Sequence, residues 1–317
     1  FYVLQVLIAC FFVLIKQEVL GAICFVALIA AILAVCDDIR ATTLPFLIIC
    51  TITTNRYNSY NLYIGYIKYV PVVLVALIYH FAVYHKSFAF GESAKGIFAA
   101  GVAISLGGLG RFTLSDYVYG GYYFFGLGFG MLFAYALMRS EFYDDKKEDR
   151  YKFAFMMTAY GMLCGFMIAN GYYKLYIEKS IVNLYPEGFS RNNLSTLLMF
   201  VMPFPLYLAK RKPAAAFLTV LVLAFLALTR SRGGFLFGCI EFAVCAVFWI
   251  FSGKTKKGRK IRLYVCLGAL AIGVCVMLPA LIKWILPRFD VDVKNETRYK
   301  MIWEAVDKFF KRPISGY

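Results

Sequence analysis

Long apolar runs recur along almost the entire chain, and they restrict the fold more than any other feature of the sequence. The runs are 14 to 20 residues long, and VLGAICFVALIAAILAVC at 19–36 is typical of them. A helix needs about 20 apolar residues to cross the hydrocarbon core of a bilayer. Hydrophobic residues make up 62% of the chain and charged residues only 16%, against about 25% charged in soluble domains. The sequence therefore predicts a polytopic membrane protein and argues against a soluble domain.

The fold class follows from the same runs. The backbone polar groups of a membrane-spanning segment must be satisfied within the segment, so we expect an all-α bundle of transmembrane helices. Eleven segments are apolar enough, at residues 1–15, 19–36, 41–54, 69–84, 97–110, 121–138, 153–170, 194–209, 213–229, 234–251 and 263–282. A further helix is expected at 295–312, where aromatic and aliphatic residues fall on one face and charged residues on the other. Such an amphipathic helix lies on the bilayer surface, here on the outer side.

The distribution of Lys and Arg predicts which side of the membrane each loop faces. The loops 139–152, 210–212 and 252–262 carry five, three and six of these residues, and they alternate to the same side. Together with 37–40 and 85–96, that side has seventeen, whereas the loops of the other side have nine. Because cytoplasmic loops are enriched in Lys and Arg, we expect the first side to be cytoplasmic. The net charge of +16 then reflects topology and anionic membrane lipid, and no nucleic-acid partner is expected.

Cysteines and chain ends add two smaller expectations. All nine cysteines lie in or at the end of apolar segments, where cysteine behaves as a small hydrophobic residue. We therefore expect neither a disulfide nor a metal site. Phe1 already lies inside an apolar run and the last residues form a loop, so we expect a piece of a longer protein.

The most informative polar stretch is LTRSRGGFLFG at 228–238, between two apolar segments on the predicted outer side. Arginine forks bind phosphate oxygens through two parallel hydrogen bonds, so Arg230 and Arg232 together suit a diphosphate. The adjacent Gly233 and Gly234 let a ligand or another backbone approach closely. Anchoring of the two helix ends by snorkelling arginines is the alternative, and the spacing alone leaves both open.

The outer loop 171–193, GYYKLYIEKSIVNLYPEGFSRNN, is rich in aromatic residues and ends just before an apolar segment. Aromatic rings stack on sugar faces, and Arg191 near the end of the loop is a second candidate for an anion site. An interfacial belt of aromatic residues with an anchoring arginine is the alternative. The two histidines, His80 and His85, fall at the predicted cytoplasmic end of the fourth segment, so neither is expected to be a base for chemistry on the outer side.

Three stretches, in this order and at this spacing, resemble the O-antigen ligase and polymerase family of bacterial membrane proteins. The first is GFSRNNLSTLLMFVMPFPLYLA at 188–209, an outer Asn-containing segment followed by a span with prolines. The second is a Thr-x-Ser-Arg-Gly turn that starts at Thr229, and the third runs from Arg298 through Trp303 to the Pro-x-x-Gly stretch at 313–316. The resemblance covers 188–317, whereas 1–187 matches only in hydropathy. We therefore expect N-terminal transmembrane helices and an outer loop in 1–187, and a ligase-like region, truncated at its C-terminal end, in 188–317.

The resemblance implies a multi-pass protein of the bacterial cytoplasmic (inner) membrane, a metal-independent glycosyltransferase that uses no cofactor. Such enzymes move a glycan from undecaprenyl diphosphate to a glycan, lipid or protein acceptor on the outer face of that membrane, as ligases or polymerases of cell-surface polysaccharide. By the same resemblance, Arg232 binds the substrate diphosphate with Arg191 and Arg298 in support, whereas Arg230 matches no family position. The family's catalytic histidine follows the Pro-x-x-Gly stretch, so the base is expected beyond Tyr317.

Two other functions stay open. A transporter or flippase for a lipid-linked or anionic substrate fits the many apolar segments, although the intramembrane charges that transport paths usually carry are nearly absent. A non-catalytic partner in polysaccharide assembly is the third possibility. The sequence does not distinguish a ligase from a polymerase, and it does not identify the sugar, the acceptor or the oligomeric state.

Overall fold

The structure is a computed structural model that describes residues 1–53, 69–84, 94–109, 147–179, 191–253, 255–280, 282 and 297–311. Every regular element in these ranges is a helix, which confirms the predicted all-helical class for the described part of the chain. In that part, three helices are long and apolar enough to cross a bilayer: Glu18–Val35, Glu148–Glu178 and Arg232–Phe251. Shorter apolar helices lie at Tyr2–Leu14, Ile39–Ile52, Pro71–Val83, Ala94–Ile104 and Pro213–Leu228. The number of eleven spans remains a prediction, and the predicted segment 121–138 lies outside the described residues.

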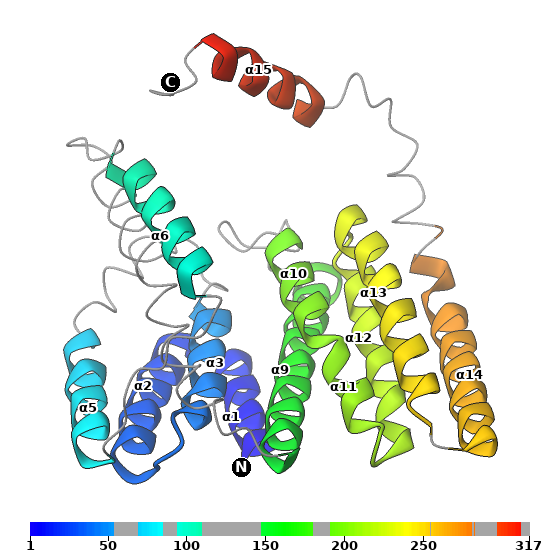
Figure 1. The fold of residues 1–317 in the computed structure, drawn as a ribbon, viewed down its shortest axis with the longest axis horizontal. Coiled ribbons are helices and arrows are strands. Elements are labelled where there is room, and N and C mark those ends of the chain that lie inside the picture. The colour runs from blue at the N-terminus through cyan, green and yellow to red at the C-terminus, as the bar shows by residue number, and fades with distance from the viewer. Residues whose placement is uncertain are drawn as a thin grey trace. The chain divides into compact units, whose positions relative to one another are not determined.

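The chain divides into two compact units, one with the described residues up to Phe166 and one with those from Met167 onward. The first unit holds α1 (Tyr2–Leu14), α2 (Glu18–Val35), η1 (Ile39–Thr42), α3 (Thr43–Thr53), α5 (Val70–Val83), α6 (Ala94–Leu109) and most of α9 (Lys147–Tyr173) (Figure 1). The predicted boundary between residues 187 and 188 lies outside the described residues.

Helix α2 shows why these sequences form membrane-type helices. It is apolar around its whole circumference, as in helices that are enclosed by protein or lipid. Phe25, Ile29 and Leu33 are buried against its neighbours α1, α3 and α5. On the opposite side, Leu20 is 50% and Val35 is 76% exposed. Large exposed apolar side chains of this kind are unfavourable in water and suit contact with lipid tails.

Two buried polar contacts join helices of the first unit. The hydroxyls of Thr51 on α3 and Tyr160 on α9 share a hydrogen bond of 2.8 Å. His80 on α5 is fully buried, and its Nδ1 lies 3.0 Å from the carbonyl oxygen of Leu33 on α2. This histidine is therefore part of the packing between α2 and α5. His85 lies outside the described residues.

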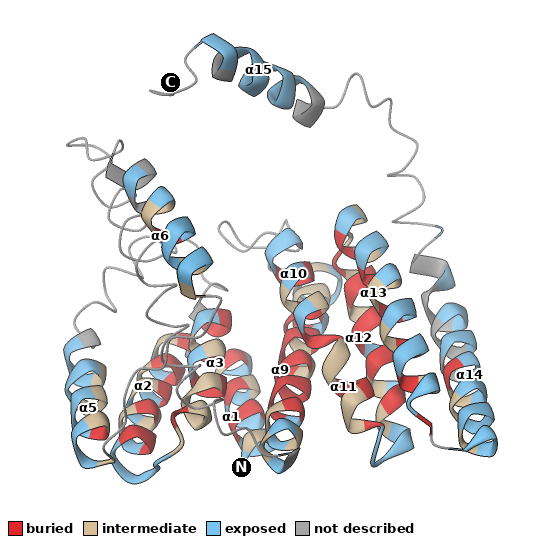
Figure 2. Ribbon diagram, in the orientation of Figure 1, coloured by how far each residue is buried: buried red, intermediate tan, exposed pale blue. Residues whose placement is uncertain are grey.

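The second unit contains the end of α9 and the elements that follow it. These are the π-helical turn η3 (Lys174–Glu178), α10 (Arg191–Val201), α11 (Pro203–Leu208), η4 (Pro213–Ala215), α12 (Ala216–Leu228), α13 (Arg232–Phe251), α14 (Lys256–Ala280) and α15 (Thr297–Lys311). Helix α12 packs against α10, α11, α13 and α14, and Figure 2 shows its mostly buried surface beside the largely exposed α14. Gly238 on α13 lies close to α12, since an added Cβ there would lie 2.9 Å from Leu226 Cδ1.

Helix α9 covers Lys147–Tyr173 and is followed by η3 at Lys174–Glu178, so parts of the predicted loops 139–152 and 171–193 are helical. Two further predicted segments differ in their limits, and each of these differences has a local cause. The segment 194–209 forms two helices, α10 and α11, because Pro203 and Pro205 have no N–H to continue the hydrogen-bond ladder. Helix α14 begins at Lys256, earlier than the predicted residue 263. Thr255 caps it, since its hydroxyl accepts a hydrogen bond of 3.0 Å from the N–H of Gly258. Much of the predicted basic loop 252–262 is therefore helix.

The predicted amphipathic helix at 295–312 corresponds to α15. The apolar side chains that the structure describes on this helix are exposed, among them Trp303 at 57% and Phe310 at 76%. On the charged side, Asp307 and Lys311 form an ion pair of 2.6 Å at the i,i+4 spacing that stabilises exposed helices. The helix is therefore amphipathic as predicted, and its contact with a bilayer surface remains a prediction.

Candidate functional site

The turn between α12 and α13 is built from a short run of hydrogen-bonding residues. Thr229 is fully buried, and its hydroxyl donates to the carbonyl of Leu226 at 2.7 Å and accepts from the N–H of Ser231 at 3.3 Å. The hydroxyl of Ser231 then accepts from the N–H of Gly234 at 3.3 Å, which makes Ser231 the N-cap of α13. Thr229 and Ser231 therefore end one helix and start the next within three residues.

Arg230, between these two residues, has a left-handed backbone conformation with φ of 57°. For a residue with a Cβ, this conformation costs about 1 kcal/mol or more, and it persists only where surrounding contacts impose it. The sharp reversal lets α13 start directly beside the end of α12. The contacts that hold Arg230 in this conformation come from α9 and η3.

The start of α10 lies against the start of α13 (Figure 1). The hydroxyl of Ser231 donates to Oδ1 of Asn192 at 3.0 Å, and the hydroxyl of Ser195 donates to the carbonyl of Asn192 at 2.8 Å. Gly234 packs against Ser195 so closely that an added Cβ would lie 2.5 Å from both its Cβ and its Oγ. Because Gly234 has no side chain, the two helix starts can meet.

Two of the three predicted arginines are the first residues of the helices whose starts meet here. Helix α10 begins at Arg191 and helix α13 begins at Arg232, so each arginine is the first residue of its helix. Neither helix has an acidic residue in its first turn. A helix N-terminus carries a partial positive charge and N–H groups that attract anions, so two such termini with two arginines make an electropositive place. The third predicted arginine, Arg298, lies in the first turn of α15, and its part in the site remains a prediction.

The side chain of Arg230 contacts α9 and η3. Its Nε donates to the hydroxyl of Tyr172 at 3.1 Å, and its Nη2 donates to the hydroxyl of Tyr176 at 2.9 Å. The guanidinium carbon lies 5.4 Å from the centroid of the Tyr172 ring. Burial lowers the pKa of the Arg230 guanidinium, but the hydrogen bonds and charge interactions of Tyr176 and Tyr172 outweigh it and raise that pKa. Arg230 is therefore a permanently charged group that joins the turn to α9 and η3.

Sequence patterns did not identify the partners of Arg230. Tyr172 and Tyr176 lie 58 and 54 residues away along the chain, and the family pattern has no counterpart of Arg230. The only available signal was the aromatic character of the loop 171–193, which also fits an interfacial belt. Likewise, the hydrogen bond between Asn192 and Ser231 spans 39 residues.

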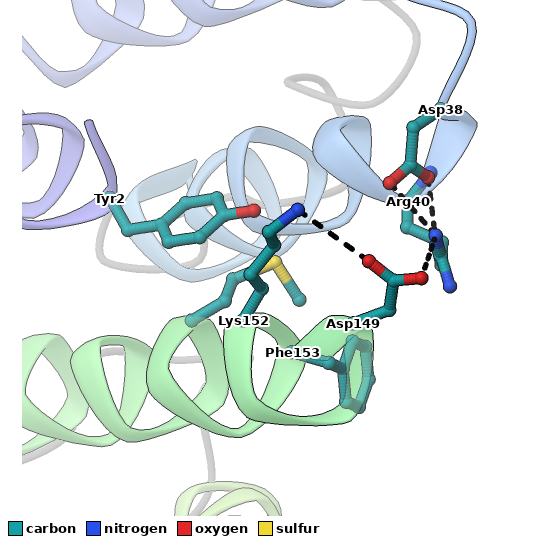
Figure 3. Close-up of a pocket in the computed structure, with 7 residues that line it drawn as sticks. Tyr2, Asp38, Arg40, Asp149, Lys152 and Phe153 are labelled. Carbon is teal, nitrogen blue, oxygen red and sulfur yellow. Dashed lines mark hydrogen bonds and ion pairs between the residues drawn. The ribbon is translucent and has the colours of Figure 1, made fainter. Parts of the chain in front are cut away.

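A second polar cluster lies in the first unit and lines a small pocket (Figure 3). Arg40 donates to both carboxylate oxygens of Asp38 at 2.8 and 3.0 Å, and its Nη2 lies 3.5 Å from a carboxylate oxygen of Asp149. Lys152 lies 3.5 Å from the other oxygen of Asp149. Two cations and two anions neutralise each other here, so the cluster connects the segment after α2 to the start of α9 and offers no excess charge to a ligand.

The described residues include no group of three or more His, Cys, Asp or Glu side chains arranged to hold a metal ion. None of the nine cysteines, all of which the structure describes, forms a disulfide. No protein-family model matches the chain, and no curated protein or solved structure matches it either. The chemistry of the site is therefore inferred from its own residues: two adjoining helix N-termini, their arginines and a pair of tyrosines.

Proposed function

We propose that the chain is a membrane-embedded glycosyltransferase of the bacterial cytoplasmic membrane. It moves a glycan from undecaprenyl diphosphate to an acceptor on the outer face, as a ligase or polymerase of cell-surface polysaccharide. Eleven transmembrane spans then put the turn between α12 and α13 at the outer membrane boundary, where the diphosphate of a lipid-linked donor lies. The apolar helices and the motif resemblance of 188–317 support this proposal.

The observation that carries the proposal is the meeting of two arginine-led helix starts. The hydrogen bond between Ser231 and Asn192 holds the N-termini of α10 and α13 together, and these helices begin with Arg191 and Arg232. In transfer of a glycan, the diphosphate is the leaving group, so negative charge grows on it as the glycosidic bond breaks. Guanidinium forks and helix amides aimed at that charge stabilise the transition state without a metal ion.

Gly233 adds room for the donor beside Arg232. A Cβ built on Gly233 meets no atom within 4 Å, in contrast to the tightly packed Gly234. A diphosphate can therefore approach the backbone at the first turn of α13, as anions do at other helix N-termini. The pair of glycines thus has two roles, one for ligand approach and one for helix packing.

The proposal is tested by replacing Arg232 with alanine in cells that express the complete chain. We expect undecaprenyl diphosphate-linked glycan to accumulate in lipid extracts, measured by mass spectrometry, with transfer reduced about 100-fold or more. Arg232→Lys keeps the charge but loses the two-pronged fork, so transfer should fall to an intermediate level. Arg211→Ala, at an exposed position between α11 and α12, is the matched control and should behave like the wild type.

Unchanged transfer by a normally expressed Arg232→Ala variant would contradict the diphosphate role and favour a non-catalytic partner in polysaccharide assembly.

A transporter or flippase is the second candidate, and Glu241 favours it. This carboxylate lies in the middle of the apolar helix α13, where an ionisable residue is costly and is usually functional. Uptake of lipid-linked glycan into vesicles without covalent transfer, and its loss in Glu241→Gln, would support that candidate.

A further inference from the structure

The proposed diphosphate site does not account for a pair of tyrosines beside the turn between α12 and α13. The rings of Tyr172, near the end of α9, and Tyr176, in η3, are stacked at a centroid distance of 5.9 Å with 12° between their planes. The hydroxyl of Tyr172 also donates to the carbonyl of Leu228 at 2.8 Å, at the end of α12. Both hydroxyls accept hydrogen bonds from Arg230, so the orientation of each ring is fixed at its polar edge.

Three unusual backbone conformations surround this pair. Arg230 is left-handed with φ of 57°, and Lys179, directly after η3, is left-handed with φ of 53°. Residues Lys174–Glu178 form a π-helical turn, a rare conformation that is frequent at functional sites. Each conformation is unfavourable by itself, and strain of this kind clusters where a protein preorganises a ligand site. Here the hydroxyl of Tyr176 lies within hydrogen-bond distance of Nη2 of Arg230, at 2.9 Å.

The pair is held rigidly and is also accessible. Tyr176 is 55% exposed although its hydroxyl and one ring face are occupied. An anchoring residue of an interfacial aromatic belt needs only a ring at the right depth and a hydroxyl that reaches water. It does not need two parallel rings, a cation at both hydroxyls and a strained arginine. The geometry therefore favours recognition of a flat ligand surface over simple anchoring.

We propose that Tyr172 and Tyr176 form a stacking subsite for a pyranose ring of the lipid-linked glycan, with Arg230 as its positioning residue. The C–H bonds on one face of a pyranose pack against an aromatic ring, while the sugar hydroxyls at the edge stay in water. Arg230 and Arg232 are two residues apart, so their Cα atoms are at most about 7 Å from each other. A diphosphate at Arg232 and the sugar attached directly to it would thus bind at adjacent positions.

This inference rests on the proposed function for the identity of the ligand, but its test is independent of transfer. Purified protein in nanodiscs is titrated with tetrasaccharides of glucose, galactose, mannose and N-acetylglucosamine, and saturation-transfer NMR is recorded with irradiation of aromatic protons. The wild type should transfer saturation to the C–H protons of one sugar face for at least one probe. Tyr176→Ala should weaken binding about tenfold, as expected for loss of one aromatic stack. Tyr176→Phe keeps the ring and should stay within about threefold of the wild type.

Tyr173→Ala is the matched control, because Tyr173 is next in the chain and 47% exposed but lies outside the stacked pair. It should bind like the wild type. Arg230→Lys keeps the charge but loses the planar fork, so it should weaken sugar binding about as much as Tyr176→Ala while thermal unfolding stays cooperative. No saturation transfer to any probe in the wild type, or equal losses in the Tyr173 and Tyr176 variants, would overturn the subsite.

A parallel titration with inorganic pyrophosphate separates the two proposals. Arg232→Ala should lose pyrophosphate binding and keep sugar binding, and Tyr176→Ala should show the reverse. If only the sugar result holds, the stacking subsite stands and the transferase proposal fails. If only the pyrophosphate result holds, the diphosphate site stands and the stacking subsite fails.

Discussion

Gly233 and Gly234 are neighbours at the start of α13, and alanine at each position should have opposite effects on stability. At Gly233 the new Cβ meets no atom within 4 Å, so no packing cost is expected. Alanine is favoured over glycine inside a helix because it restricts the unfolded chain, a gain of about 0.5–1 kcal/mol. Gly233→Ala should therefore be at least as stable as the wild type in thermal unfolding of the detergent-solubilised protein.

At Gly234 the same methyl group would lie 2.5 Å from both Cβ and Oγ of Ser195, about 1 Å short of the 3.4 Å at which ordinary contact begins. A Cβ atom cannot rotate away, so α10 or α13 must shift. Overpacking of this kind costs about 1–3 kcal/mol. Ser195→Gly removes both clashing atoms, so the double variant should recover most of the loss, a coupling that a double-mutant cycle measures.

At Gly233 the effect of alanine on transfer should be opposite to its effect on stability. Gly233→Ala is stable but fills the space in which a diphosphate meets the backbone, so transfer in cells should fall about tenfold or more. Full transfer by Gly233→Ala would show that no ligand uses this space. Wild-type stability of Gly234→Ala would refute the close packing of α10 on α13.

Four further outcomes follow from the geometry. Ser231→Ala removes the cap of α13 and should lower the free energy of unfolding by about 1 kcal/mol, measured by chemical denaturation; no change would contradict the cap. Arg40→Ala breaks the charged hydrogen bonds to Asp38 and the ion pair with Asp149, and it should lower the free energy of unfolding by about 1–3 kcal/mol. Arg40→Lys should recover only part of that loss, whereas full recovery would mean that the fork geometry is unimportant. Because the pKa of Arg230 is raised, its stabilising contribution to the fold is complete below the ordinary arginine pKa and is lost only as pH rises above about 12. Sugar binding should therefore be constant from about pH 5 to pH 9. A loss of binding in that range would argue against the contacts of Arg230 with Tyr172 and Tyr176 as the cause. In a variant whose other two tryptophans are replaced by phenylalanine, brominated lipids in nanodiscs should quench the fluorescence of Trp303. Unquenched emission would contradict the contact of α15 with the bilayer surface.

The helices could be predicted from the sequence because apolar runs and helices coincide wherever the structure describes both. The limits were less accurate, and the errors have a common cause. Charged residues at helix ends were assigned to loops, but α14 extends back to Lys256 because Thr255 supplies a cap. Conversely, hydropathy predicts one continuous segment at 194–209, although the helix breaks before Pro203. Hydropathy measures only how apolar a residue is, and the break arises because proline has no backbone N–H to donate.

The candidate site was predictable only in part for a different reason. Arg191 and Arg232 could be identified from short motifs, because each lies at a helix start that is determined by neighbouring residues in the chain. The hydrogen bonds of Arg230 go to Tyr176 and Tyr172, which lie 54 and 58 residues away along the chain, so no local sequence pattern predicts them. The same holds for Ser195 and Gly234, whose close approach requires the packed helices themselves.

The start of α14 links the stability of this protein to the charge of the membrane around it. Lys256, Lys257, Arg259 and Lys260 occupy the first turns, where the helix dipole is already positive, an arrangement that costs a few tenths to about 1 kcal/mol for each cation. The sequence has no acidic residue between Glu241 and Asp290 to offset them. Anions from outside the chain can neutralise these cations, and any anion that binds the folded state shifts the folding equilibrium toward it by mass action. Anionic lipid headgroups that bind these cations would then stabilise the folded state, so the free energy of unfolding would depend on the fraction of anionic lipid in the membrane.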